Sequence, residues 1–356
     1  MVLPIITLKI ERHAPPGWIR AFLPALAVLI TFVLTSALVL MAGANPLEAY
    51  YYFLLEPLTS RVSLLEVLVK ATPLLLTGAA VTLAFSGGFW NIGAEGQFLA
   101  GATAATAVGL AVQQFPAPFA IPLTLLAGIM GGMAWIAVPA LMKIRLGIDE
   151  VVTTLLLNSV ALLVVSALLN GPWRDPISQW PQSPEIASAA ILPKLVPRSR
   201  LHLGFLLVLL IVVLLGITIS RTAFGIRLRA VGMEPEAARF AGIEVWRVIL
   251  TTALLSGGVA GLAGAIEVAG IHYRLIEAIS GGQGYTGIVI ATLSGLNPWA
   301  VLPAALFIAL IDTGSQTVSR ALGVPVYLGE VIQATLLLVM LAVLLLQSYR
   351  IRLEHK

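Results

Sequence analysis

The sequence predicts an all-α polytopic membrane protein, and its composition and its apolar periodicity carry that prediction. Of 356 residues, 59% are hydrophobic and only 11% are charged, which is far from the composition of a soluble domain. Apolar runs of about 20 residues recur along the chain, and helices satisfy their own backbone hydrogen bonds in lipid. No cysteine is present, so disulfides, thiolate metal sites and cysteine nucleophiles are excluded.

Hydropathy and helix breakers together predict about ten transmembrane helices within one domain over residues 1–356. The predicted segments are residues 18–41, 62–85, 89–112, 118–141, 149–169, 201–219, 248–270, 284–296, 299–319 and 327–347. The eighth segment is too short to cross a bilayer at right angles. We expect it to be a half-span or a broken helix, which leaves nine or ten spans.

The two hydrophilic connections have different characters. Residues 170–200 are rich in proline and contain Trp173 and Trp180, so we expect an irregular external loop with interfacial anchors. Residues 220–247 form the second connection, in which Pro235 suits the first turn of a short helix and Gly242 suits its end. With both termini in the cytoplasm, most lysines and arginines outside the spans fall inside.

Two pairs of short motifs predict an inverted repeat. "SGGFWNIG" from Ser86 resembles "SGGQGYTG" from Ser280, and "EVVTTLLL" from Glu150 resembles "EVIQATLLL" from Glu330. In the predicted topology each pair starts on opposite sides of the membrane, as an inverted repeat of spans 2–5 and 7–10 requires. Chance similarity between Gly-rich and Leu-rich runs is the alternative.

Polar residues interrupt the apolar pattern at both copies of the Gly-rich motif. An inverted repeat places a transport path at its interface, beside discontinuous helices. We therefore expect the polar and aromatic residues at these two breaks to line a translocation path: Trp90, Asn91, Glu95, Gln97, Gln283, Tyr285 and Thr286. For Glu95, local hydrogen bonding to loop amides is an equally good interpretation.

Small residues recur at helical spacing on two other segments, where close helix packing is expected. They are Ala253, Gly257, Gly261 and Ala265, together with Gly128 and Gly132.

Several functions are excluded by missing motifs. None of the lysines is followed by Ser or Thr, so the chain has no phosphate-binding loop and no ATPase site of its own. It also lacks HExxH and Gly-x-Ser-x-Gly motifs, which argues against an enzyme. The sequence has no concentrated basic face of the kind that binds nucleic acid. No metal site is predicted.

The runs "NIGAEGQ" and "RAVGMEPEAARFAGIEVWR" together resemble the permease subunit of bacterial ABC importers for nucleosides and simple sugars. This group is associated with basic-membrane-protein-type binding lipoproteins and lies within the branched-chain amino acid/ribose permease superfamily. The resemblance extends over nearly the whole chain, including "GIDEVVTTLLLN" and "SGGQGYTGIVIATLSGLNPWAVLPAALF".

The resemblance implies partners and a docking role. A coupling helix would rest on a separate ABC ATPase, which binds ATP and Mg, while this chain holds no cofactor. In this sequence the coupling residues would be Glu234, Pro235, Glu236, Ala237, Ala238, Arg239 and Gly242. A second permease subunit, identical or related, and an external substrate-binding lipoprotein would complete an importer in the bacterial inner membrane.

The resemblance implies a nucleoside as the substrate, and Trp90 and Tyr285 suit stacking against a base. Aromatic faces also bind sugars, so a pentose or hexose importer is the alternative. A third possibility is an ion-coupled secondary transporter that uses Glu95, Glu267 or Asp312.

Overall fold

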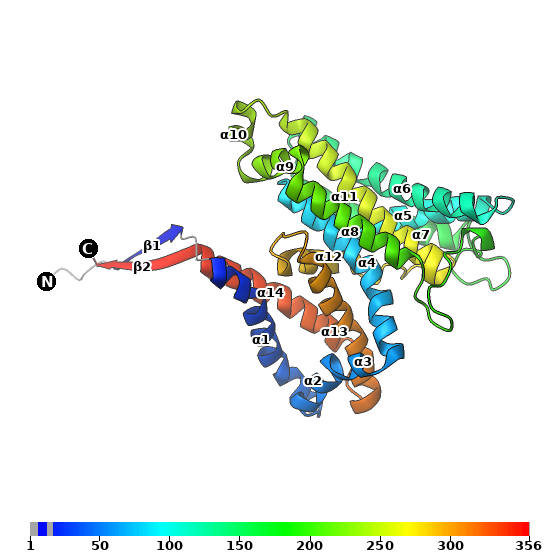
Figure 1. The fold of residues 1–356 in the computed structure, drawn as a ribbon, viewed down its shortest axis with the longest axis horizontal. Helices are drawn as coiled ribbons and strands as arrows, with labels where there is room; N and C mark the ends of the chain where they lie inside the picture. The colour runs from blue at the N-terminus through cyan, green and yellow to red at the C-terminus, as the bar shows by residue number, and fades with distance from the viewer. Residues whose placement is uncertain (1–5, 13–16, 356) are drawn as a thin grey trace. The chain divides into compact units, whose positions relative to one another are not determined.

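A computed structural model describes residues 6–12 and 17–355, and helices make up most of it (Figure 1). Each of the ten predicted segments overlaps one α-helix of the structure. These helices are α1 (Gly17–Met41), α4 (Arg61–Ser86), α5 (Ala94–Ala111), α6 (Ala117–Leu146), α7 (Glu150–Asn170), α8 (Gly204–Arg221), α11 (Val245–Glu267), α12 (Gln283–Leu293), α13 (Val301–Leu322) and α14 (Leu328–Ser348).

The predicted class, an all-α polytopic membrane protein, is confirmed. Within the described residues, six helices are long and apolar enough to cross a membrane, or up to seven if a bent pair, Ala25–Met41 with Pro46–Thr59, is one span. Fewer than ten helices therefore qualify as full spans. Polar Glu95 and Gln97 begin α5, and α12 has only 11 residues, which agrees with the half-span expected at 284–296.

The remaining elements are short. They are β1 (Ile6–Arg12), α2 (Pro46–Leu54), α3 (Glu56–Thr59), the 3-10 turn η1 (Ser188–Ala190), α9 (Ala223–Met233), α10 (Pro235–Phe240), the π-helical turn η2 (Val268–His272) and β2 (Tyr349–His355). The chain forms two compact units by its internal contacts, residues 1–53 with 314–356 and residues 54–313. A single domain over 1–356 remains a prediction, and its residues 1–5, 13–16 and 356 lie outside the described residues.

The unit of residues 1–53 and 314–356 joins the two ends of the chain. Strands β1 and β2 pair antiparallel from Ile6 opposite His355 to Arg12 opposite Tyr349. Both heptapeptides alternate apolar and polar residues, the period of a strand. This two-stranded ribbon is an addition to the predicted all-α class. In the same unit α1 lies against α14, and the Tyr50 hydroxyl donates to the carbonyl of Phe32 at 2.6 Å.

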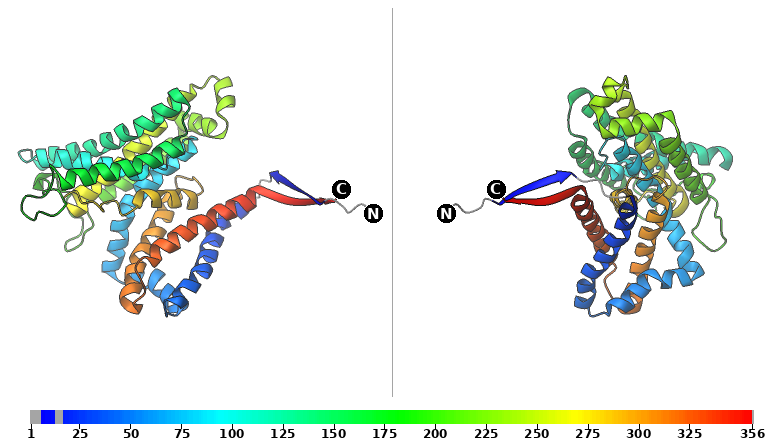
Figure 2. Two further views of the ribbon diagram at one scale, coloured as in Figure 1. Left: turned by 180° about the vertical axis from the view of Figure 1, so that it is seen from behind. Right: turned by 60° about the vertical axis from the view of Figure 1, so that its left-hand side comes forward.

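The unit of residues 54–313 is a helical bundle around α4, whose residues 71–84 are all buried. Helices α5, α6 and α11 run side by side, as Figures 1 and 2 show from three directions. Their contacts depend on the small residues expected from the sequence. A Cβ added to Gly132 or Gly261 would overlap the backbone of a neighbouring helix, and one added to Gly128 would overlap the Cβ of Ala265. The predicted close packing is therefore confirmed.

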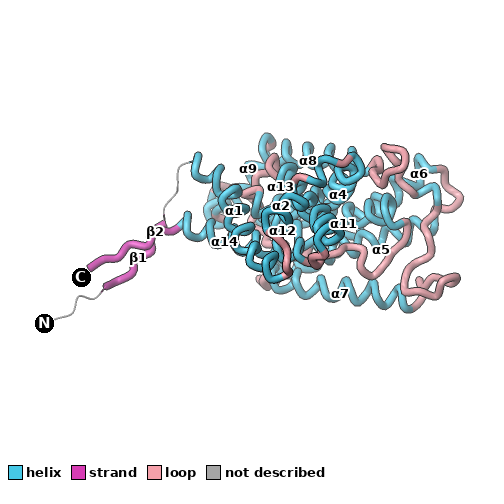
Figure 3. The backbone as a smooth tube through the Cα atoms, turned by 90° about the horizontal axis from the view of Figure 1, so that it is seen from below, coloured by secondary structure: helices cyan, strands magenta, loops and turns pink. Residues whose placement is uncertain are grey.

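The connection between α7 and α8 is irregular, as predicted for residues 170–200, and lies among the loops shown in pink in Figure 3. Backbone hydrogen bonds join it to η2 and to the segment that follows η2. Ser183 donates to the carbonyl of Leu275 at 2.9 Å, and Leu192 donates to that of Ala269 at 2.9 Å. This loop therefore covers one end of the bundle, while α9 and α10 lie at the other end (Figure 1).

Candidate functional site

The break between α4 and α5 is closed by buried amide and hydroxyl groups. Asn91 Nδ2 donates to Gln97 Oε1 at 2.9 Å, and Gln97 Nε2 donates back to Asn91 Oδ1 at 2.8 Å. Asn91 Nδ2 also donates at 3.0 Å to Oγ of Ser256 on α11, which donates to the Ala80 carbonyl on α4 at 2.8 Å. Asn91 and Gln97 are both buried, so these amides bind each other in this conformation.

Glu95 joins the first turn of α5 to the start of α12. Its carboxylate accepts a hydrogen bond from Oγ of Ser280, and a second from the backbone N–H of Gly284 at 2.8 Å. A Cβ on Gly284 would overlap the backbone of Ala94 and Glu95, so a glycine is needed for this close approach. The motif that starts at Ser280 therefore meets the chain at Glu95, two residues after the motif that starts at Ser86 ends.

Three polar residues spaced by four along α7 bind the same break from its other side. We call Glu150, Thr154 and Asn158 the α7 ladder, because this spacing places them on one face of the helix. Their side-chain oxygens accept hydrogen bonds from the backbone N–H groups of Trp90, Ile92 and Gly96 at 3.1, 3.3 and 2.9 Å respectively. Buried backbone N–H groups need partners, and the ladder supplies them where the helical pattern is interrupted.

The α7 ladder also reaches α12. Asn158 Nδ2 donates to the carbonyl of Ile92 at 3.0 Å and to the hydroxyl of Tyr285 at 3.1 Å. Asn158 therefore holds both helix breaks at once.

The predicted path residues differ in their exposure. Trp90 is 51% exposed and Tyr285 is 42% exposed, so both aromatic side chains are open to a ligand or to lipid. Thr286 and Gln283 are half-buried, and Oε1 of Gln283 is enclosed with no hydrogen-bond partner. The structure thus places all seven predicted residues at the two breaks, with the two aromatic rings outermost. Their role in a path stays a prediction.

Sequence reasoning missed the residues that hold these breaks in place. Ser256, Ser280 and the α7 ladder were not among the predicted site residues. The spacing of Glu150, Thr154 and Asn158 was a usable signal, since polar residues four apart in an apolar helix share one face. Ser256 gave no such signal, because a single serine in a small-residue helix is also typical of packing.

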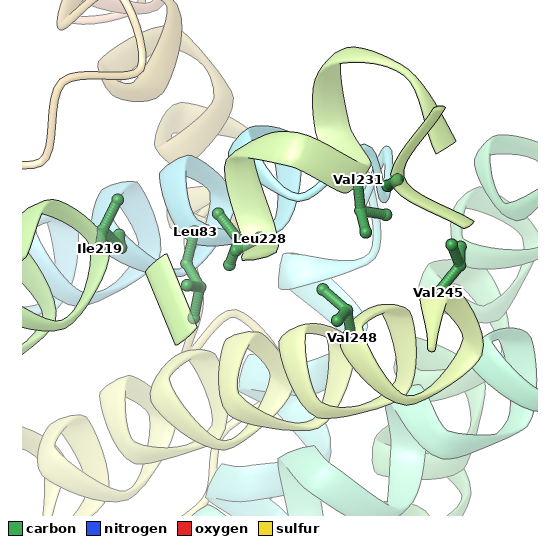
Figure 4. Packing of buried hydrophobic residues seen from close by; sticks show 7 residues of the cluster. Leu83, Ile219, Leu228, Val231, Val245 and Val248 are labelled. Carbon is green, nitrogen blue, oxygen red and sulfur yellow. The ribbon is translucent and has the colours of Figure 1, made fainter. Parts of the chain in front are cut away.

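The predicted coupling loop folds as two short helices, α9 and α10, which we call the docking segment. A cluster of buried apolar side chains fixes it to the bundle, as Figure 4 shows. The cluster joins α4, α8, α9, α10 and α11 through Leu83, Ile219, Leu228, Val231, Ala238, Val245 and Val248. The docking segment therefore packs against α4, the helix that ends at the polar break, and against α8 and α11.

The helix α10 begins and ends as the sequence predicts. Pro235 is its first residue, and Gly242 follows it with φ +80°, a conformation that suits glycine. Ala238 packs into the buried cluster, so this side chain faces the bundle. The other predicted coupling residues are exposed: Glu234, Pro235, Glu236, Ala237, Arg239 and Gly242.

The exposed face of α10 combines charge with one large apolar side chain. Glu236 accepts from Arg239 at 2.8 and 3.0 Å. Phe240, which the sequence analysis did not single out, is 94% exposed. An isolated exposed phenylalanine beside a charged pair suits a protein partner better than water.

Charged groups at the opposite end of the bundle are tied to the 171–203 loop. Arg200 pairs with both carboxylate oxygens of Glu66 on α4, and this hydrogen bonding raises the pKa of Arg200. A hydrogen bond from Ser178 lowers the pKa of Asp175 to about 2. Burial lowers the pKa of His202 to about 4, so this imidazole is neutral near pH 7.

Within the described part of the chain, no group of three or more His, Cys, Asp or Glu side chains is arranged to hold a metal ion. The hydrogen-bonding groups of the seven predicted path residues are amides, hydroxyls, the indole N–H of Trp90 and one carboxylate, that of Glu95. Such groups suit recognition of an uncharged polar ligand by hydrogen bonds.

The chain matches known transport proteins over most of its length. Residues 63–344 match the family described as the permease component of the branched-chain amino acid transport system. The chain is 37% identical to the glucose ABC transporter permease protein of Haloferax volcanii, over 96% of this chain and 92% of that protein. It is 32% identical to the guanosine ABC transporter permease protein of Bacillus subtilis, over 92% and 94% of the two chains.

A third relative is the nucleoside ABC transporter permease protein of Lactococcus lactis, 27% identical over 89% of this chain and 90% of that protein. No solved structure matches the chain. The family match covers well over half of the sequence and includes both helix breaks, the α7 ladder and the docking segment. The chain therefore belongs to the family of permease components of branched-chain amino acid transport systems, as a multi-pass membrane protein of the ABC type.

Proposed function

We propose that the chain is the membrane permease of an ATP-driven importer and forms the translocation path for a nucleoside. The observation that carries this proposal is the meeting of two helix starts at Glu95 inside an apolar bundle. Interrupted helices with polar groups near the middle of a membrane domain are typical of substrate pathways.

In this proposal the two half-exposed aromatic rings contact the substrate. Trp90 and Tyr285 offer flat faces for a base or a sugar ring, and Gln283 and Thr286 supply hydrogen-bonding groups beside Tyr285. Asn91, Glu95 and Gln97 form the part of the path wall that lies behind these residues. Their polar atoms are used in the hydrogen bonds that hold the breaks together.

Energy is proposed to come from a separate ABC ATPase that binds ATP and Mg and rests on α10. The exposed Glu236, Arg239 and Phe240 supply the contact surface. The buried cluster behind α10 would pass a movement of that ATPase to the bundle. The binding free energy of ATP is then used to shift the permease between two conformations.

The remaining partners follow from the family. A second permease subunit, identical or related, would complete the path, and an external binding lipoprotein would deliver the substrate to the 171–203 loop. The basic residues around α9 and α10, Arg227, Arg229 and Arg239 among them, support a cytoplasmic docking segment. Both termini would then be cytoplasmic, in the cell's inner membrane.

The substrate class rests on the relatives and on the neutral polar character of the site. Two of the three relatives described are named for guanosine or nucleosides. Simple sugars are the second candidate, because the relative at 37% identity is named for glucose. The ribose of a nucleoside and a free hexose share the hydroxyl groups that such a site recognises.

An ion-coupled secondary transporter is a weaker candidate. Glu267 is a buried acid near the end of α11, with one carboxylate oxygen 3.6 Å from Nε2 of His272. It lies at the end covered by the 171–203 loop, away from the junction of α5 and α12. Family membership also favours ATP over an ion gradient.

The decisive experiment is uptake into proteoliposomes that contain the permease, its ATPase and its binding protein. We expect ATP-dependent accumulation of a radiolabelled nucleoside, with free hexose as a weak competitor. Accumulation of a hexose alone would keep the ABC mechanism and reverse the choice of substrate. Accumulation driven by an ion gradient without ATP would refute the proposed mechanism.

A further inference from the structure

We propose that the α7 ladder is a positioning device that links the docking segment to Tyr285, so that both helix breaks move as one unit. Glu150, Thr154 and Asn158 would act on substrate only through the backbone they hold. The inference deepens the proposed function and rests on it, because it assigns a route between the ATPase contact and the path.

The route starts where the docking segment touches the break. A Cβ on Gly232, near the end of α9, would overlap the carbonyl of Ser86. A Cβ on Gly88 would lie 3.1 Å from the Cα of Gly232. These two glycines place the backbone leading into α10 directly against the backbone that leaves α4. A displacement of α10 therefore reaches residues 86–88 without passing through flexible side chains.

Glu150, the first residue of the α7 ladder, and its partner Lys143 contact the residues that follow in the segment after α4. Glu150 forms an ion pair with Lys143 at the end of α6. Lys143 Nζ donates to the carbonyl of Gly88 at 3.3 Å, and Glu150 accepts from the N–H of Trp90 at 3.1 Å. The pair thus binds a backbone acceptor and a backbone donor on either side of Phe89. Lys143 also lies 5.5 Å from the centre of the Phe89 ring, within range of a cation–π contact.

The other two ladder residues, Thr154 and Asn158, extend these contacts to α12. Thr154 holds the N–H of Ile92, and Asn158 holds the N–H of Gly96 and the Tyr285 hydroxyl. In the apolar interior each of these groups would be costly to leave without a partner. The break and Tyr285 therefore follow α7 when α7 tilts, and they cannot slide past it one residue at a time.

Thr154→Val tests the ladder with a matched control elsewhere in the bundle. Thr154 and Thr124 are both buried, and both hydroxyls donate to a carbonyl one turn earlier in their own helix. Only Thr154 also accepts from the break, at Ile92. Thr124→Val removes the same hydroxyl from a buried helix and leaves the ladder intact.

The first measurement is hydrogen–deuterium exchange of the peptide spanning residues 87–98, in the permease alone. Thr154→Val should raise exchange in this peptide roughly fivefold, as expected for loss of one hydrogen bond, and Thr124→Val should not. Glu150→Gln keeps an acceptor for the Trp90 N–H and should retain protection at this position, whereas Glu150→Ala should lose it.

The second measurement is the ratio of substrate transported to ATP hydrolysed, in the reconstituted complex with its ATPase and binding protein. Thr154→Val and Asn158→Leu should lower this ratio several-fold while ATP hydrolysis continues. Thr124→Val should leave it unchanged. Loss of transport together with loss of ATP hydrolysis in equal measure would contradict a positioning role.

The outcomes separate this inference from the proposed function. If hydrogen–deuterium exchange of residues 87–98 is unchanged in Thr154→Val and Asn158→Leu, the proposed role of the α7 ladder is wrong, whatever the transport result. Raised exchange with an unchanged transport ratio would also overturn it, because the contacts would then serve stability alone. A wild-type permease that binds no ATPase and transports no nucleoside would instead refute the proposed function, and the exchange experiment would still report whether the ladder holds the break.

Discussion

Glu95, Asn91 and Gln97 share one short segment and make different contacts. The two amides bind each other, and Asn91 also binds Ser256, so they stabilise the break between α4 and α5. Glu95 instead binds Ser280 and Gly284 across to α12. Among these three residues, Glu95 is the one that bonds across to α12, so it has the greatest effect on how α5 and α12 meet.

Replacing Glu95 should uncouple the two helix starts. Glu95→Ala leaves the Gly284 N–H without its acceptor in a buried place, at a cost of about 1–3 kcal/mol. Glu95→Gln keeps one acceptor oxygen and should lose less. The measurement is thermal unfolding of the purified permease in detergent, combined with uptake at equal protein level.

Ser280→Ala provides the control through a double-mutant cycle. If Glu95 acts through Ser280, the double variant should lose less stability than the sum of the two single losses. Full additivity would contradict the contact as the source of the effect.

His202 makes the stability of the permease depend on pH. Its pKa is about 4 in the folded protein, because burial disfavours the charged ring, and about 6.5 in an unfolded chain. As the pH falls through 6.5 the unfolded chain takes up the proton first, so the free energy of unfolding declines from about pH 6.5 to 4. Between pH 7 and 5 the loss should be roughly 2 kcal/mol.

His202→Phe should flatten this part of the pH profile. The ring lies against Gly204 and Gly270, and phenylalanine fills a similar space without a titrating group. The melting temperature, measured at pH 7, 6 and 5, should fall less steeply in the variant than in the wild type. Parallel profiles would show that another group carries the pH dependence.

At the scale of the element, α10 illustrates how a six-residue helix presents two faces. Ala238 points into the buried cluster, while Glu236, Arg239 and Phe240 are exposed. A large residue at 238 would disturb folding, because a well-packed site does not accept added volume without cost. The exposed residues are therefore the ones that test docking.

Phe240→Ala should weaken binding of the ATPase and leave the permease folded. Loss of a buried aromatic anchor at an interface costs about 2 kcal/mol or more, which corresponds to at least roughly a thirtyfold weaker Kd. Co-purification and ATP-dependent uptake both measure this.

Ile177→Ala is the matched control, because Ile177 is also strongly exposed but lies in the 171–203 loop at the other end of the bundle. Equal effects of Phe240→Ala and Ile177→Ala on ATPase binding would contradict docking at α10.

The elements were predictable where apolar runs define them. The helices match the predicted segments within a few residues, and Pro235 and Gly242 correctly predicted the limits of α10. The terminal ribbon was missed although residues 6–12 alternate in polarity, because the apolar run that follows dominated the interpretation. The contacts of Asn158 were not predictable, since they depend on two breaks far apart in sequence meeting beside α7.

At the scale of the whole molecule, the chain is one component of a transport system and carries no phosphate-binding loop of its own. In the proposed mechanism, transport by this chain depends on ATP hydrolysed by a separate subunit. Of the three candidate acids for ion coupling, Glu95 lies at the junction of α5 and α12 and is hydrogen-bonded there, whereas Glu267 and Asp312 lie on α11 and α13.

A catalytically inactive ATPase partner should abolish substrate accumulation by the complete complex. A proton or sodium gradient imposed on the same vesicles should not restore it. Glu267→Gln is the informative permease variant, and it should keep most of the ATP-driven uptake. Accumulation that survives the inactive ATPase and disappears in Glu267→Gln would favour a secondary transporter.

The hydrogen bond from Gly284 to Glu95 has an electrostatic consequence for selectivity. The start of a helix attracts anions, because its first N–H groups are not used within the helix. At α12 one of these groups already holds a carboxylate of the protein. A substrate with its own carboxylate or phosphate would find this N–H already occupied. The start of α12 therefore offers this N–H to no anionic group of an amino acid or a nucleotide, whereas neutral molecules, such as nucleosides and sugars, do not depend on it.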